Sequence, residues 1–200
     1  MDRAAEARAA GLARRVVPYL PARGRVLDLG CGAGHNAAAL RRLGRLPVVE
    51  ADVVDLSRSG SIVLFDGERL PFSDDSFQAC TLFFVLQYVR RPRLLWRELQ
   101  RVVAGPILVM QSVAARNASL GWVRRSDWLL GPAGVQADRA LGYFSCPGVA
   151  PLWRVERSFS GENFRVWLGE HGMRADLLER GPWPVGPLGH DLYRVEPVAS

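Results

Sequence analysis

The 200-residue sequence contains no lysine, so all 26 of its basic residues are arginine. An arginine-only composition indicates a genome bias, such as that of some bacteria, and not a binding surface. The formal net charge of +6 permits a nucleic-acid partner, but such a site needs its charge gathered on one face. The arginine pairs are instead dispersed along the chain, which argues against nucleic acid. They are Arg14-Arg15, Arg41-Arg42, Arg90-Arg91 and Arg124-Arg125.

The sequence is also poor in cysteine and histidine, with three of each. Cys31, Cys80 and Cys146 have neither CxxC spacing nor histidines placed as co-ligands, so we expect no metal site and no disulfide framework. The longest apolar run, residues 81–89, is too short to span a membrane, which takes roughly 20 residues. The N-terminus lacks the apolar core of a secretory signal. These absences favour a cytoplasmic location.

The composition, 48% hydrophobic and 23% charged, is typical of a single soluble globular domain, which we expect to cover residues 1–200. Residues 1–22 read as an N-terminal helix. Further helices are expected at 35–43, ended by Gly44, at 93–103, and after an N-cap at Ser160. The expected strands are 25–29, 46–54, 61–65, 78–84, 107–111, 174–179 and 191–196. This alternation predicts an α/β fold with a mostly parallel sheet, interrupted by an insertion at 112–158.

The segment VLDLGCGAGHN, residues 26–36, places Gly30, Gly32 and Gly34 on the first strand-to-helix turn, where open α/β sheets bind ligands. The spacing GxGxG lacks the third glycine of the dinucleotide pattern GxGxxG, and no Lys-Ser or Lys-Thr follows, which excludes a P-loop. Glycines alone also fit a tight turn that needs positive φ. Neighbouring residues must therefore distinguish a binding site from a plain turn.

Acidic side chains lie in or directly after the first three predicted strands. Asp28 lies inside an apolar strand, where a buried carboxylate needs a hydrogen-bond donor. Asp52 ends the second predicted strand and suits acceptance from ribose hydroxyls, with Glu50 and Asp55 as alternatives. Asp66 follows the third predicted strand.

Together, VLDLGCGxG, the acid that ends strand two and the motif DGERLPFSDDSF at residues 66–77 resemble the class I S-adenosylmethionine-dependent methyltransferases. The resemblance covers about residues 12–112 and, more weakly, 160–197. It implies a Rossmann-like, seven-stranded, mostly parallel sheet with helices on both faces and a C-terminal antiparallel hairpin. It also implies S-adenosyl-L-methionine as cofactor, a zwitterion that suits a helix N-terminus and nearby acceptors. A nicotinamide dinucleotide becomes the minor alternative.

The resemblance further implies a role for each matching residue. The three glycines would contact the methionine part of the cofactor, and Asp28 would support its amino group or the glycine loop. Asp52 would bind the ribose hydroxyls. The remaining implied contacts are Val53 on the adenine face, Asp66 and the Gly67 backbone at the adenine edge, Leu70 on its apolar side, and Phe83 along the methionine arm.

No catalytic residue follows directly, because alignment and desolvation can supply much of the acceleration of methyl transfer. Many family members have histidine where Gln87 and Tyr88 stand and aspartate where Gln78 stands. Tyr88 and His190 are therefore the candidate bases. Trp122 and Trp128 in the insertion either fill a core or line an acceptor cavity.

We expect an enzyme that methylates oxygen, nitrogen or carbon of a small, apolar or aromatic acceptor, with residues 112–158 as lid and recognition element. The alternatives are an RNA or protein methyltransferase on the same fold and a non-catalytic partner subunit. The oligomeric state is not indicated by the sequence.

Overall fold

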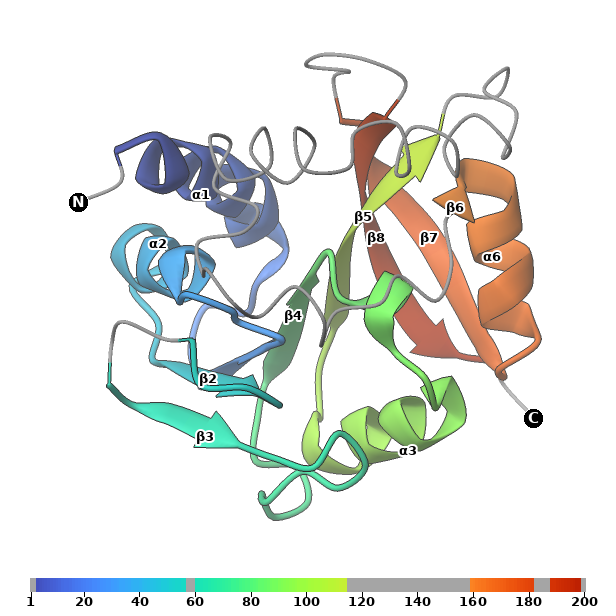
Figure 1. The fold of residues 1–200 in the computed structure, drawn as a ribbon, viewed down its shortest axis with the longest axis horizontal. Helices are drawn as coiled ribbons and strands as arrows, with labels where there is room; N and C mark the ends of the chain where they lie inside the picture. Colours follow the sequence, from blue (N-terminus) through green and yellow to red (C-terminus); the bar gives the residue numbers. More distant parts are fainter. Residues whose placement is uncertain (1–2, 57–59, 115–158, 182–187, 199–200) are drawn as a thin grey trace.

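A computed structural model describes residues 3–56, 60–114, 159–181 and 188–198. Its strands form one sheet in the order β3-β2-β1-β4-β5-β8-β7 (Figure 1). The first five of these strands are parallel, and β8 runs antiparallel to both of its neighbours. The strands are β1 Val26–Leu29, β2 Val48–Asp52, β3 Ile62–Leu64, β4 Ala79–Phe83, β5 Ile107–Ala114, β7 Met173–Glu179 and β8 Leu188–Pro197. A two-residue strand, β6 (Phe159–Ser160), pairs in parallel with the end of β5.

The helices cover both faces of this sheet. They are α1 Arg3–Val16, α2 His35–Gly44, α3 Pro92–Val102 and α6 Gly161–Gly169, with 3-10 turns η1 Val17–Tyr19 and η2 Leu86–Tyr88. Apolar side chains of α1 and α2 pack with one face of β4 and β5, through residues such as Leu12, Leu40 and Leu108. Side chains of α3 and α6, such as Trp96 and Phe164, pack against the other face. The predicted fold class is confirmed.

The centre of the sheet is β1 and β4, in which every residue is buried. Strands buried on both faces lie in the middle of a parallel sheet. The chain adds β2 and β3 on one side of β1 and then returns to add β4 on the other side. This reversal is the topological switch point of the sheet, so the carboxyl ends of β1 and β4 form the natural ligand crevice.

The predicted elements occur in the expected order, with a few shifted boundaries. Strand β5 continues to Ala114, so the first residues of the predicted insertion are strand; residues 115–158 lie outside the described part of the chain. Gly44 does not end the second helix by left-handed geometry, because that conformation belongs to Arg45, at φ 53°. Ser160 caps α6 as predicted, and Asn163 completes a reciprocal capping box with it.

The N-terminal helix is shorter than the predicted 1–22. Helix α1 ends at Val16, and the 3-10 turn η1 that follows has Pro18 as its second residue. Because proline has no N–H to donate and its ring clashes with the preceding turn, a regular helix is not continued there. Within the described ranges, no helix has the length and apolar character needed to cross a membrane.

Candidate functional site

The glycine turn between β1 and α2 is built from three residues with left-handed backbone. The φ angles of Gly30, Gly32 and Gly34 are 73°, 53° and 80°. A Cβ at Gly30 would lie 2.5 Å from a methyl group of Val85, whereas a Cβ at Gly32 would meet no atom within 4 Å. The first glycine therefore permits close packing against the segment that follows β4. The second leaves open space beside the turn, where a ligand can approach the backbone.

Asp52 connects the tip of β2 to this turn. Its carboxylate accepts the N–H of Gly32 at 2.8 Å and the N–H of Val53 at 2.7 Å. The side chain is only 4% exposed, and burial raises its pKa while the backbone N–H donors oppose that rise. The acid predicted to bind ribose hydroxyls thus also holds the glycine turn in place, a contact that the sequence did not indicate.

Asp28 is buried in the middle of β1. One carboxylate oxygen accepts the Thr81 hydroxyl of β4 at 2.8 Å, and the other, Oδ2, has no hydrogen-bond partner among the described residues. Burial raises the pKa of Asp28 to about 7, and the nearby Glu50 and Asp52 add to that rise. Sequence reasoning missed Thr81, although a hydroxyl inside an apolar strand is the same kind of signal as Asp28 itself.

Glu50, an alternative to Asp52 in the sequence, has a different role. Its carboxylate is fully buried and accepts from Arg41 of α2 at 2.6 Å. The same guanidinium donates to the Val48 carbonyl at 2.6 and 3.1 Å. This ion pair connects α2 to β2, so Glu50 stabilises the packing of the helix on the sheet. Asp52 is therefore the acid that stands at the tip of β2.

The loop that follows β3 carries the third predicted acid, Asp66. Asp66 is exposed, and its Oδ1 accepts the N–H groups of Arg69 and Glu68, both at 2.8 Å. These N–H groups lower the pKa of Asp66. The adjacent Gly67 has φ 83°, and a Cβ there would lie 3.5 Å from Val53 Cγ1. The two predicted adenine contacts from different strand tips are therefore neighbours, and Val53 is 53% exposed.

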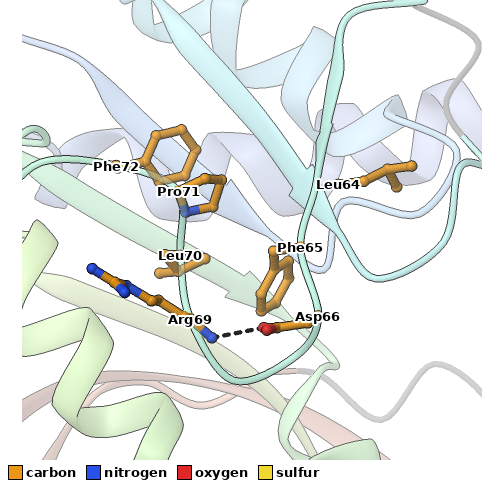
Figure 2. A pocket seen from close by; sticks show the side chains of 7 residues that line it. All are labelled: Leu64, Phe65, Asp66, Arg69, Leu70, Pro71 and Phe72. Carbon is orange, nitrogen blue, oxygen red and sulfur yellow. Dashed lines mark hydrogen bonds between the residues drawn. The ribbon is translucent and has the colours of Figure 1, made fainter.

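A hollow of about 420 Å³ lies between the two limbs of this loop (Figure 2). One limb carries Leu64 to Asp66 and the other carries Leu70 to Phe72, with the backbone N–H of Arg69 hydrogen-bonded to Asp66 where they join. The hollow contains Asp66 and Leu70 of the predicted set but no residue of the glycine turn. Of the predicted cofactor site, the hollow therefore includes only residues expected to contact adenine.

Helix α3 fixes the second limb of the loop through two charged side chains that sequence reasoning missed. Glu98 accepts the Leu70 N–H at 2.9 Å, and Arg101 donates to the carbonyls of Leu70 and Phe72 at 3.0 and 2.7 Å. Arg101 also pairs with Glu98 at 2.6 Å and with Asp74 at 2.9 Å. An acid and an arginine three residues apart on a helix usually form an ion pair exposed to solvent. The sequence therefore gives no sign that this pair also binds the loop backbone.

The end of β4 provides the third side of the site. Phe83, predicted to line the methionine arm, is 7% exposed and packs with the core formed by α1 and α2. Its role towards a ligand stays a prediction. Phe84, the next residue, has φ 61°, an uncommon conformation for a bulky side chain. Tyr88 follows in η2 and is half-buried.

His190, the other predicted base, lies in β8 and is paired in register with Ser112 of β5. Its Nδ1 is 3.3 Å from the Ser112 hydroxyl, and its ring centroid is 4.8 Å from that of Phe84. Burial lowers the pKa of His190 to about 4, and the charge of Arg8 adds to the effect. The imidazole is therefore neutral at neutral pH and a weak proton acceptor.

The glutamines at positions where family members carry other residues have structural partners. Gln78 directly precedes β4, so it lies where the parallel strands begin, at the end of the sheet away from the glycine turn. Its side chain accepts the Arg25 N–H at 2.9 Å. Gln87 accepts from the buried Gln111 of β5 at 2.8 Å. The change at position 78 therefore lies away from the predicted cofactor residues.

The remaining predictions concern metals, thiols and tryptophans. Among the described residues no cluster of histidine, cysteine and acidic side chains is placed to hold a metal ion. Cys31 and Cys80 are buried free thiols, and burial raises the pKa of both. Trp122 and Trp128 lie outside the described residues.

Comparison with known proteins gives a family match over the part of the chain that contains the predicted cofactor residues. Residues 27–105 match the methyltransferase domain family. An uncharacterized methyltransferase of Mycobacterium avium is 38% identical over 86 residues, which cover 38% of this chain and 34% of that protein. A demethylmenaquinone methyltransferase of Clavibacter sepedonicus is 39% identical over 90 residues, covering 40% and 36%. The matched segments thus span about a third of these relatives.

Solved structures resemble the whole chain in fold. A putative methyltransferase from Bacillus halodurans superposes with a TM-score of 0.59 at 14% identity, covering 96% of this chain and 99% of that one. A putative methyltransferase solved with the Trm112 methyltransferase activator of Haloferax volcanii gives 0.58 at 17% identity, covering 100% and 94%. At these identities the likeness concerns the fold.

Proposed function

Since residues 27–105 belong to the methyltransferase domain family, within a sheet of the class I type, we propose that the protein is an S-adenosyl-L-methionine-dependent methyltransferase of a small acceptor. The observation that carries the proposal is the glycine turn at the switch point of the sheet. There Gly32, which is open on its Cβ side, donates its N–H to the buried Asp52, and a second buried carboxylate, Asp28, lies in β1 just before the turn.

The residues at this crevice fit the chemistry of the cofactor. An ammonium would supply the donor that Asp28 Oδ2 lacks, and the backbone N–H groups at the start of α2 suit a carboxylate. Asp52 has lone pairs beyond the two N–H groups that it accepts, so it can also take ribose hydroxyls.

At the other end of the crevice, Val53 offers an exposed apolar face to adenine. Asp66 uses one oxygen for the loop and keeps the other for an exocyclic amine, beside the Gly67 backbone. Leu70 supplies apolar contact in the hollow of Figure 2, and Phe83 closes the floor below the methionine arm.

When bound, S-adenosyl-L-methionine supplies a methyl group carried on a sulfonium. The chain's part is to align the acceptor with that methyl group and to exclude water, which together account for much of the acceleration in such transfers. Tyr88 follows the carboxyl end of β4, and His190, near the start of β8, pairs with Ser112 near the carboxyl end of β5. These two are the proposed acceptor-side residues. We propose an apolar or aromatic acceptor of small-molecule size, with Trp122 and Trp128 among its contacts.

Calorimetric titration with S-adenosylmethionine and S-adenosylhomocysteine tests the cofactor site through a matched pair of variants. Gly32→Ala and Gly172→Ala both put an alanine at positive φ, 53° and 73°, with no atom within 4 Å of the new Cβ. Each should cost roughly 1–2 kcal/mol of folding stability through backbone strain. Only Gly32→Ala should weaken cofactor binding, by about tenfold or more, because its methyl group occupies the open side of the turn.

Equal losses of affinity in the two variants would mean that general destabilisation, and not the turn, governs binding. Absence of binding by the well-folded wild-type protein would contradict the proposal itself. An Asp52→Ala variant, which leaves the Gly32 N–H without its acceptor, should lose affinity as Gly32→Ala does.

A partner-dependent function is the second candidate, because one structural neighbour was solved together with a methyltransferase activator. In that case the isolated protein would bind the cofactor but would yield S-adenosylhomocysteine only after a partner is added.

A nucleic-acid substrate would instead give affinity for mixed RNA that falls steeply with salt.

A further inference from the structure

Four polar side chains from η2, β5 and β8 lie next to one another near the carboxyl end of β5. Gln111 of β5 donates to Gln87 of η2 at 2.8 Å and is paired in register with Asp191 of β8. Asp191 accepts the Tyr193 hydroxyl at 3.2 Å and the Gly181 N–H at 3.1 Å. We call Gln87, Gln111, Asp191 and Tyr193 the glutamine cluster.

The glutamine cluster lies on the face of the sheet that α3 and α6 cover. Gln111 stands between Val109 and Val113, and side chains two residues apart in a strand share a face. Both valines belong to the core that α3 and α6 form with the sheet. Tyr193 belongs to that core too, with its ring centroid 4.8 Å from that of Phe164 of α6. The cluster is therefore polar within apolar surroundings, where an unmade hydrogen bond is costly.

Gln111 leaves one such hydrogen bond unmade. Its Nε2 donates to Gln87 Oε1 and to the Ser112 carbonyl, the latter at 3.2 Å, and these two oxygens fix the orientation of the amide. Its Oε1 is buried and has no hydrogen-bond partner in the described part of the chain, and the residue is 1% exposed. Native proteins rarely bury an amide oxygen without a donor, because its desolvation is then uncompensated. A ligand N–H would supply that donor.

Gln87 adds a hydrogen-bond donor at the accessible side of the cluster. The other three members are at most 9% exposed, whereas Gln87 is half-buried, so a ligand meets the cluster first at Gln87. Its Oε1 accepts from Gln111, and no described residue accepts from its Nε2. One acceptor, Gln111 Oε1, and one donor, Gln87 Nε2, thus stay available on two amides that share a hydrogen bond.

The cluster adjoins the proposed cofactor site and the proposed acceptor-side residues. The segment just before Gln87 packs on the glycine turn, where a Cβ at Gly30 would lie 2.5 Å from a methyl group of Val85. Tyr88, one proposed acceptor-side residue, directly follows Gln87, and the other directly precedes Asp191. A molecule bound at the cluster would therefore lie beside both the methyl donor and these residues.

We propose that the glutamine cluster recognises a carboxamide group of the methyl acceptor. The amide N–H of the acceptor donates to Gln111 Oε1, and its carbonyl oxygen accepts from Gln87 Nε2. Gln87 and Gln111 thus determine specificity, and they hold the acceptor while its reacting atom is aligned with the methyl group of the cofactor. This inference rests on the proposed methyltransferase function and deepens it by naming the substrate class.

The same groups disfavour acceptors that carry a carboxylate or an ester in place of the amide. An ionised carboxylate and an ester both lack a proton to donate to Gln111 Oε1, so that oxygen would stay unpaired in the complex. A carboxylate would also lie near the Asp191 side chain, and like charges repel. A carboxamide satisfies both free groups of the cluster and brings no charge.

Benzamide and acetophenone are matched probes for this site, because they differ only in an NH₂ or a CH₃ group beside the same carbonyl. Their binding to the protein loaded with S-adenosylhomocysteine is measured by ligand-observed NMR, which detects weak affinities. Benzamide should bind about tenfold or more tightly than acetophenone, because acetophenone leaves Gln111 Oε1 without a donor. Benzoate should also bind more weakly than benzamide.

Gln111→Met removes the amide oxygen and keeps the length of the side chain. The affinities for benzamide and acetophenone should then differ by no more than about twofold, because the unpaired oxygen that distinguishes them is gone. For the same reason the urea midpoint of the variant should be unchanged or higher. Gln100→Met, the same substitution at an exposed position of α3, should keep the wild-type preference for benzamide.

Calorimetry with S-adenosylhomocysteine separates this inference from the proposed function. Both variants should bind it as the wild type does, since Gln111 and Gln100 lie outside the cofactor residues. A loaded wild-type protein that binds the two probes equally, or does not bind benzamide, would overturn carboxamide recognition while leaving the cofactor site intact, and this comparison needs no variant. A preference that persists in Gln111→Met would overturn it too. Failure of the wild type to bind S-adenosylhomocysteine would overturn both.

Discussion

At the scale of single residues, the site depends on acids that the fold keeps away from water. Asp28, Glu50 and Asp52 are each at most 4% exposed, on two adjacent strands. Each buried carboxyl group has a different set of hydrogen-bond donors. Glu50 has Arg41, Asp52 has two backbone N–H groups, and Asp28 has one hydroxyl. Asp28 has the fewest donors, and burial raises its pKa to about 7, so the stability of the protein should depend on its protonation.

The Asp28→Asn variant should therefore be more stable than the wild type at high pH. The folded-state pKa of about 7 exceeds the ordinary 3.8, so ionisation of Asp28 costs folding free energy. That cost grows as pH rises from about 4 to 7 and is constant above. We expect the gain of the variant to be about 2–3 kcal/mol larger at pH 8 than at pH 5.

Urea unfolding of both proteins at the two pH values measures this difference. The variant should also bind S-adenosylmethionine more weakly at pH 8, because an amide replaces the carboxylate that we propose faces the ligand ammonium. A stability gain that is the same at pH 5 and pH 8 would show that Asp28 has an ordinary pKa in the folded protein.

At the scale of elements, helix α3 sets the position of the loop that carries Asp66 and Leu70. Arg101 reaches two loop carbonyls and two acids from one planar group. These acids raise the pKa of Arg101 further above its usual range, so it stays charged. A lysine in its place could not make the same forked set of hydrogen bonds.

Arg101→Lys should consequently loosen the loop. We expect a loss of about 1–2 kcal/mol in the free energy of unfolding and a several-fold weaker affinity for S-adenosylhomocysteine, measured by urea unfolding and calorimetry. Arg97→Lys, at an exposed position of the same helix, is the control and should change neither quantity. Unaltered cofactor affinity in Arg101→Lys would show that the loop keeps its position without α3.

At the scale of the whole molecule, α1 is part of the domain and not an appendage. Its buried residues include Leu12, Ala13 and Val16, which pack with α2 and with the β4 and β5 face of the sheet. Arg15 connects it to β7 and β8 as well. The helix should therefore unfold together with the sheet.

Leu12→Ala tests that expectation. Removing a side chain that is 6% exposed should cost about 2–4 kcal/mol and lower the urea midpoint while the slope and the single transition are kept. Arg14→Ala, on the exposed side of α1, should stay within about 0.5 kcal/mol of the wild type. A curve with two transitions, helix lost first, would contradict the view that α1 belongs to the same folding unit.

The elements and their order followed from local pattern alone. Apolar runs between glycines specify the strands of a parallel sheet, and the Ser160 N-cap specifies where α6 begins, since both depend on neighbouring residues in the chain. The glycine turn and its acids could be located for the same reason. Boundaries were less certain, as at Arg45 and Ala114, because tertiary pairing extends or ends an element.

The sequence by itself determined the fold class, the place of the glycine turn and the acids in or directly after the first three strands. Only the tertiary structure decided which acid has which partner: that Asp52 holds Gly32, that Glu50 pairs with Arg41, and that Asp28 keeps one oxygen without a hydrogen bond. The same holds for Arg101 below the loop and for Arg8 beside Phe84. These contacts join residues far apart in the chain, and no local pattern encodes the distance between them.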